Sequence, residues 1–194
     1  NVIVMVDGNY NSISSQSEKL KTWVQKGGTL IPFKRAIRWA KSKGISNVTI
    51  KKASDDKKNK KRRPYEKQGA DSGAEVIGGA IFSTELDLTH PLGFGYHSSN
   101  LPIFRRGTLF LEPAKNPYAT PLVYTSSPLL SGYISKKNLD TLCNSASIVV
   151  SGMGQGKVIN MADNTNFRAF WYGTNKLFAN AIFFGNIISG GTVE

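Results

Sequence analysis

Two short polar clusters contain the residues best suited to hold a ligand. The first consists of Asp7, Asn9 and Asn11, and the second consists of Asp163, Asn164 and Asn166. Each cluster follows an apolar segment that is typical of a β-strand, and ligands of open α/β sheets gather at the carboxyl ends of strands. The same residue types also make turns and cap helices, so the clusters are either a ligand site or local structure.

The two histidines do not have the pattern of a zinc site. Catalytic zinc takes three protein ligands and keeps one position open for water. His90 is followed by Pro-Leu-Gly and His97 by Ser-Ser-Asn, so neither has a carboxylate three residues later. We therefore expect no metal and no cofactor in this chain. We expect His90 to be a turn residue whose ring is hydrogen-bonded locally.

No familiar nucleophile motif is present. The G-x-S-x-G pentapeptide of serine hydrolases is absent. The only cysteine, Cys143, lies between a helical and an apolar segment, and we interpret it as a small buried residue. Gly152, Gly154 and Gly156 have G-x-G-x-G spacing but lie between two predicted strands, which favours a hairpin turn over a phosphate loop. We therefore expect no catalytic residue in this chain.

The formal net charge of +12 is unevenly distributed. Residues 51–67 hold nine basic and three acidic side chains, so this stretch carries nine minus three, or +6. Such a block could bind nucleic acid, but its single aromatic residue, Tyr65, provides little surface for base stacking. We predict that residues 54–69 form a basic mobile loop, and we expect no nucleic-acid partner.

Strand and helix signals alternate along the first fifty residues. Val2–Val6, Thr29–Phe33 and Val48–Ile50 are short apolar runs that indicate buried strands. A capping-box spacing begins at Ser15, and Arg35–Lys43 has helical spacing. This β-α-β-α-β order predicts a parallel sheet with crossover helices.

The rest of the chain indicates extended segments, a hairpin and a last helix. Leu101–Pro128 contains five prolines, which disfavour helix. Ser147–Val150 and Lys157–Ala162 are predicted to form the hairpin, and Asn166 can cap the last helix. No apolar run approaches the 18 or more residues of a membrane span, so we expect none.

Two segments resemble the C-terminal accessory domain of some secreted bacterial zinc carboxypeptidases of the carboxypeptidase A-like superfamily. Glu85–Ser135 contains E-L-D-L-T-H-P-L-G-F-G-Y and L-P-I-F-R-R-G-T-L-F-L-E-P, and Met161–Gly185 begins M-A-D-N-T-N-F-R-A-F-W-Y-G. That domain in turn is similar to class I glutamine amidotransferases. The resemblance implies a three-layer α/β sandwich of flavodoxin-like kind, with a mainly parallel sheet and a C-terminal hairpin and helix.

The resemblance also implies a single domain over residues 1–194 that is truncated at its N-terminus. Related domains carry further strands and a helix before the position matched by Asn1, which leads here directly into a strand. A truncated sheet edge would expose unpaired backbone and apolar side chains. We therefore expect that the chain can self-associate through this edge.

Phe33 and Lys34 occupy the place of the amidotransferase nucleophile. In that family a cysteine lies at the sharp strand-to-helix turn, and the matching turn here is Ile31–Arg35. Neither replacement supplies a thiolate, so the resemblance implies that this chemistry is lost. We expect Phe33 to pack toward the core and Lys34 to be exposed.

The implied function is that of a non-catalytic accessory domain in a secreted or periplasmic zinc metallocarboxypeptidase. The domain would support the peptidase domain of the same parent chain, or bind substrate or cell-envelope material. Zinc would be held only by the separate peptidase domain. Two alternatives remain open: a stand-alone α/β enzyme whose pocket contains Asp7 and Asp163, or a basic nucleic-acid-binding module.

Overall fold

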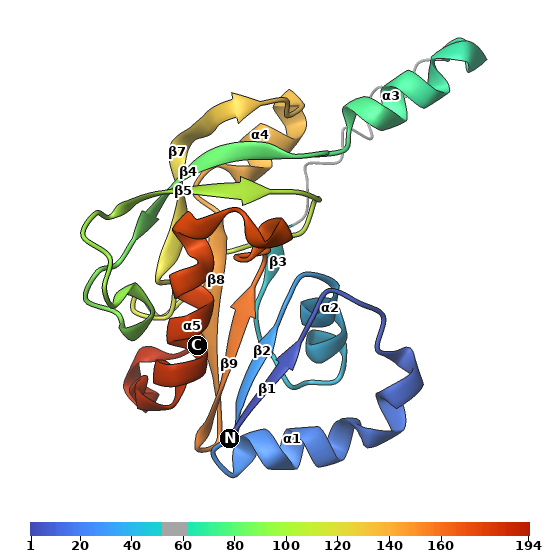
Figure 1. Cartoon of the computed structure of the whole chain (residues 1–194). Coiled ribbons are helices and arrows are strands. Elements are labelled where there is room, and N and C mark those ends of the chain that lie inside the picture. Colours follow the sequence, from blue (N-terminus) through green and yellow to red (C-terminus); the bar gives the residue numbers. More distant parts are fainter. Residues whose placement is uncertain (52–61) are drawn as a thin grey trace.

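The computed structural model describes residues 1–51 and 62–194 (Figure 1). Its strands join in one nine-stranded sheet. The strands are β1 (Val2–Met5), β2 (Thr29–Pro32), β3 (Ile50–Lys51), β4 (Ala80–Leu86), β5 (Asn100–Arg105), β6 (Phe110–Leu111), β7 (Leu122–Gly132), β8 (Ala146–Met153) and β9 (Gly156–Met161). The α-helices are α1 (Ser17–Gln25), α2 (Arg35–Ser42), α3 (Gln68–Ala74), α4 (Lys136–Leu142) and α5 (Asn175–Phe184).

The sheet is mixed, and the expectation of a mainly parallel three-layer sandwich is wrong. The strand order is β1-β2-β9-β8-β7-β4-β5, with β6 pairing with both β8 and β3. Among the described strands, only the β1–β2 and β2–β9 pairs are parallel. The other six pairs are antiparallel.

The connections between strands explain this difference. The helix α1 joins β1 to β2 as a crossover connection, and these two strands pair in parallel. The third predicted strand is displaced to β3 and pairs antiparallel with β6. β9 takes the place beside β2 instead, and it arrives from β8 through a tight turn in which Met153 pairs with Gly156. The predicted hairpin after Ser147–Val150 is thereby confirmed.

Helices cover both faces of the β2–β9 region. Leu30 of β2 packs with residues of α1 and α2, whereas its neighbour Ile31 packs with residues of α5. Val158 and Ile159 of β9 alternate in the same way. Successive side chains of a strand point to opposite faces, so these two strands, whose residues are all buried, require cover on both sides.

Only part of the predicted basic loop lies within the described residues. Residues 54–61 lie outside them. Tyr65–Lys67 forms a 3₁₀-helix and leads into α3, which extends away from the sheet (Figure 1). Arg63 forms an exposed ion pair with Asp71 at 2.9 Å.

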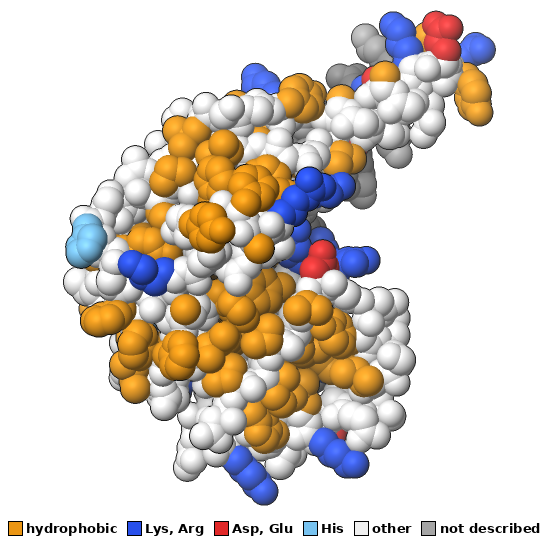
Figure 2. Space-filling view, in the orientation of Figure 1, with side chains coloured by type: hydrophobic (Ala, Val, Ile, Leu, Met, Phe, Trp, Pro, Cys, Tyr) orange, Lys and Arg blue, Asp and Glu red, His pale blue; other side chains and the backbone are white. Residues whose placement is uncertain are grey.

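The outer edge of β1 has no strand partner among the described residues. Ile3 and Val4 are 38% and 37% exposed, and Val6 beyond the strand is 64% exposed. Figure 2 shows apolar side chains gathered over this side of the molecule. Self-association through this edge stays a prediction. Within residues 1–51 and 62–194, none of the helices has the length and apolar character needed to cross a bilayer.

His90 caps the short 3₁₀-helix Pro91–Gly93 that packs against α5. Its Nδ1 accepts a hydrogen bond from the Leu92 N–H at 3.1 Å, which confirms the expected local hydrogen bond. The Asn180 side chain of α5 donates to the Leu92 carbonyl oxygen at 2.8 Å. Burial lowers the pKa of His90, and the negative charge of Asp87 offsets this effect only in part.

We predict that His90 makes the protein less stable in acid. The pKa of His90 is lower in the folded chain than in the unfolded chain, so the unfolded chain binds more protons below about pH 6.5. The free energy of unfolding therefore decreases as the pH falls from about 6.5 through the pKa of the folded state. His90→Asn keeps a side-chain acceptor but removes this titration. Urea unfolding at a series of pH values should show a smaller loss of stability for His90→Asn than for the exposed control His97→Asn. Equal losses in the two variants would contradict the prediction.

Candidate functional site

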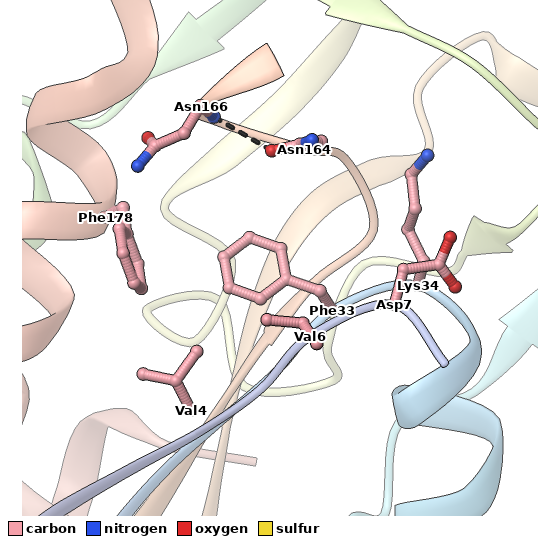
Figure 3. Close-up of a pocket in the computed structure, with 8 residues that line it drawn as sticks. All are labelled: Val4, Val6, Asp7, Phe33, Lys34, Asn164, Asn166 and Phe178. Carbon is pink, nitrogen blue, oxygen red and sulfur yellow. Dashed lines mark hydrogen bonds between the residues drawn. The ribbon is translucent and has the colours of Figure 1, made fainter. Parts of the chain in front are cut away.

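The carboxyl ends of the three mutually parallel strands meet at one pocket of about 220 Å³, which we call the strand-end pocket (Figure 3). β1, α5 and the first residues after β1 and β2 contribute the apolar wall. The segments after β1, β2 and β9 contribute the polar groups. The lining residues are Val4, Val6, Asp7, Phe33, Lys34, Asn164, Asn166 and Phe178. Residues from opposite ends of the sequence therefore share one cavity.

Two aromatic rings form the centre of the apolar wall. Phe33 is 8% exposed and meets Phe178 edge-to-face, with 5.5 Å between the ring centroids. This contact confirms the expectation that Phe33 packs toward the core. In Figure 3, Phe178 lies on one side of Phe33, and Asp7 and Lys34 lie on the other.

Lys34 has a strained backbone at the sharp turn between β2 and α2. Its φ of 48° and ψ of −111° place it in a region that non-glycine residues rarely adopt. The Lys34 N–H donates to the Met161 carbonyl oxygen at 3.0 Å, and the Phe33 N–H donates to the Met5 carbonyl oxygen at 2.9 Å. These bonds to β9 and β1 hold the turn in place. The Lys34 side chain lines the pocket and is half-buried rather than exposed.

The side chain of Asp7 lies at the N-terminus of α2. One carboxylate oxygen accepts from the Arg35 N–H at 3.3 Å and from the Arg35 Nε at 2.9 Å. Burial raises the pKa of Asp7, but the hydrogen bonds from Arg35 and the positive charges of Arg35 and Lys34 outweigh it and hold the pKa below its ordinary value. The carboxylate is therefore ionised at neutral pH and already has a partner.

Some of the remaining predicted site residues line the strand-end pocket and others do not. Asn164 accepts from the Asn166 N–H at 3.0 Å in a local turn, and both residues line the pocket. Asn9 makes the same kind of turn with the Asn11 N–H at 3.0 Å, and neither residue lines it. The structure thus brings Asp7, Asn164 and Asn166 together and leaves Asn9 outside.

Asp163 is buried beneath the pocket in an ion pair with Arg105. The guanidinium is 1% exposed, and its Nη1 lies 2.8 Å from the carboxylate. Tyr124 and Ser147 donate hydroxyl hydrogen bonds to the other carboxylate oxygen at 2.6 and 2.8 Å. Burial raises the pKa of Tyr124 well above its ordinary value, which keeps the phenol protonated as a donor. Asp163 is therefore held by a buried ion pair and by buried hydrogen bonds, and it does not line the strand-end pocket with Asp7.

A second pocket of about 240 Å³ adjoins the first and shares Asp7 and Lys34 with it. We call it the basic pocket. Its remaining lining residues are Arg35, Arg38, Arg106, Gly107, Thr108, Leu109 and Ala162. Sequence reasoning missed Arg38 and Arg106 because nothing local indicates that α2 and the segment after β5 meet. The one available signal was the Arg105-Arg106-Gly107 turn between two predicted extended segments.

The described residues offer no cluster of three or more histidine, cysteine or acidic side chains suited to a metal ion.

No protein-family model and no curated protein matches the chain. Solved structures with a similar fold include a cytoplasmic protein from Salmonella typhimurium, with a TM-score of 0.47, 15% identity, and coverage of 94% of this chain and 70% of that chain.

A ThuA-like protein from Bacteroides uniformis matches with a TM-score of 0.47, 13% identity, and coverage of 94% of this chain and 67% of that chain. A β-galactosidase from Rahnella sp. R3 matches with a TM-score of 0.35, 11% identity, and coverage of 92% of this chain and 21% of that chain. None of these three names is that of a carboxypeptidase. Similarities this low assign no activity to the chain.

We predict that Asp163→Asn lowers the free energy of unfolding by roughly 3–5 kcal/mol, because it leaves the buried Arg105 charge without a carboxylate. Adding Arg105→Met should recover part of the loss, since no unpaired charge then remains. The exposed control Asp140→Asn should change stability by less than about 0.5 kcal/mol. Urea unfolding of the four proteins measures these differences. An Asp163→Asn variant as stable as the control would contradict the prediction.

Proposed function

We propose that this chain is a non-catalytic ligand-binding domain whose site is the strand-end pocket. The observation that supports this best is the turn after β2. It has a strained backbone at the start of a helix, where amidotransferases place their nucleophile, but it carries Phe33 and Lys34. Phe33 has no nucleophilic atom and is packed against Phe178.

The groups around Lys34 do not make a catalytic set. Acyl transfer requires a nucleophile beside a base, and backbone N–H groups that stabilise an oxyanion. The lining of the strand-end pocket includes no serine, threonine, cysteine or histidine. The N–H groups of Lys34 and Arg35 already donate to Met161 and Asp7. The ionised Asp7, with its lowered pKa, is a weak base at neutral pH.

The chemistry of the lining favours a ligand that combines an apolar group with hydrogen-bonding groups. Phe33, Phe178, Val4 and Val6 offer apolar surface, and the amide side chains of Asn164 and Asn166 offer donors and acceptors. A peptide or a fragment of cell-envelope material has this combination. The ligand class therefore agrees with an accessory role in a zinc carboxypeptidase, which the sequence resemblance implies.

In that role the peptidase domain of the same parent chain would be the partner, and it alone would hold zinc. The location would be secreted or periplasmic. The exposed edge of β1 offers a surface for docking or self-association. These finer assignments rest on the sequence resemblance.

We predict that the neutral peptide analogue N-acetylphenylalaninamide binds the strand-end pocket. Nuclear magnetic resonance titration should show weaker binding to Phe178→Ala, by about fivefold, because the aromatic contact is lost. Phe183→Ala is the matched control, since Phe183 lies on the same helix and is 73% exposed. Equal affinity of the two variants, or no binding by the unmodified chain, would contradict the proposed site.

We predict no hydrolysis of glutamine or of peptides by the purified chain. The missing nucleophile and base are the physical reason. Product release should be measured for the unmodified chain and for Lys34→Ala. Turnover that disappears in Lys34→Ala would show that the turn after β2 is catalytic and that the non-catalytic assignment is wrong.

A further inference from the structure

The basic pocket concentrates positive charge at one end of the sheet. Lys34, Arg35 and Arg38 come from the turn before α2 and from its first turn, and Arg106 comes from the segment after β5. Asp7 is the only acidic residue in the lining. Four cations less one carboxylate leave a charge of +3 on the lining.

Most of this charge is available to a ligand. Arg35 is held by Asp7 at 2.9 Å. Within residues 1–51 and 62–194, no carboxylate forms an ion pair with Lys34, Arg38 or Arg106. Arginine guanidinium groups match oxyanions in shape and bind them with two parallel hydrogen bonds. The cations that face one cavity therefore form a receptor for an anion.

Hydrogen bonds hold the segment that carries Arg106 in place. Arg105 donates through Nη2 to the Leu109 carbonyl oxygen while its Nη1 pairs with Asp163. The Gly107 N–H donates to the Ile77 carbonyl oxygen at 2.9 Å, and Gly107 has a φ of 99° that suits glycine. The buried ion pair thus connects the segment after β5 to the end of β9. This arrangement positions Arg106 opposite α2 before any ligand arrives.

We propose that the basic pocket binds a phosphate group, and that the rest of the phosphorylated ligand extends into the strand-end pocket. A lining charge of +3 suits a phosphate dianion better than a single carboxylate. Lys34 and Asp7 line both pockets, so a ligand that passes Lys34 reaches the rings of Phe33 and Phe178. The phosphate site goes beyond the proposed function, whereas the extension into the strand-end pocket rests on it.

Asp7 reduces the attraction of the basic pocket for an anion. Its carboxylate lies on Arg35 and at the N-terminus of α2, where an anion is favoured. Asp7→Asn removes this negative charge with little change of shape. The variant should bind phosphate more tightly than the unmodified chain.

Calorimetric titration with inorganic phosphate at low ionic strength tests the site. The double variant Arg38→Gln/Arg106→Gln should bind about tenfold more weakly or worse, because two charge-assisted contacts are lost. Lys19→Gln/Lys136→Gln is the matched control, since both lysines are exposed and the net charge changes equally. Thermal melting should show that both double variants are folded. Equal weakening in the two variants, or no phosphate binding by the unmodified chain, would overturn the proposal.

Titration with phenyl phosphate separates a phosphorylated ligand from free phosphate. Phenyl phosphate should bind more tightly than inorganic phosphate, and Phe178→Ala should remove this advantage while leaving the affinity for inorganic phosphate unchanged. Equal affinity of the two anions for the unmodified chain would overturn the extension into the strand-end pocket. Phosphate binding without any binding of N-acetylphenylalaninamide would show that the proposed function fails while the phosphate site stands.

Discussion

The buried ion pair between Arg105 and Asp163 is the interaction on which both pockets depend. Asp163 lies between Ala162, which lines the basic pocket, and Asn164, which lines the strand-end pocket. The Arg105 guanidinium also donates to the carbonyl oxygen of Leu109, which lines the basic pocket. Desolvating two charges is costly, and Tyr124 and Ser147 offset part of this cost by donating to the carboxylate. The two charged groups therefore lose solvation, and their pairing fixes the geometry at this end of the sheet.

The turn after β2 has a strained backbone at Lys34. The Phe33 N–H is held by β1 and the Lys34 N–H by β9, so the strain follows from the position of the turn between two parallel neighbours. The turn places Phe33 and Lys34 in the lining of the strand-end pocket. Phe33 supplies apolar surface on one side, and Lys34 supplies a charge that both pockets share.

The sequence predicted what depends on local pattern and missed what depends on distant pairing. The β8–β9 hairpin and the cap at His90 follow from spacing and turn chemistry within a few residues. The mixed sheet does not, because β9 takes the place beside β2 that local order assigned to the next strand. The buried partner of Asp163 could not be predicted either, since Arg105 is 58 residues away. Residues near strand ends were therefore identified, but their separate roles were not.

A crystal structure of the chain with phenyl phosphate tests most directly whether the ends of β1, β2 and β9 form a non-catalytic binding site. The expected result is an intact ester with its phosphate between Arg38 and Arg106 and its ring against Phe178. Such a complex would also show the Arg105–Asp163 pair unchanged, since the site is formed before the ligand binds. Phenyl phosphate bound at another surface, or free phosphate in place of the ester, would contradict this assignment.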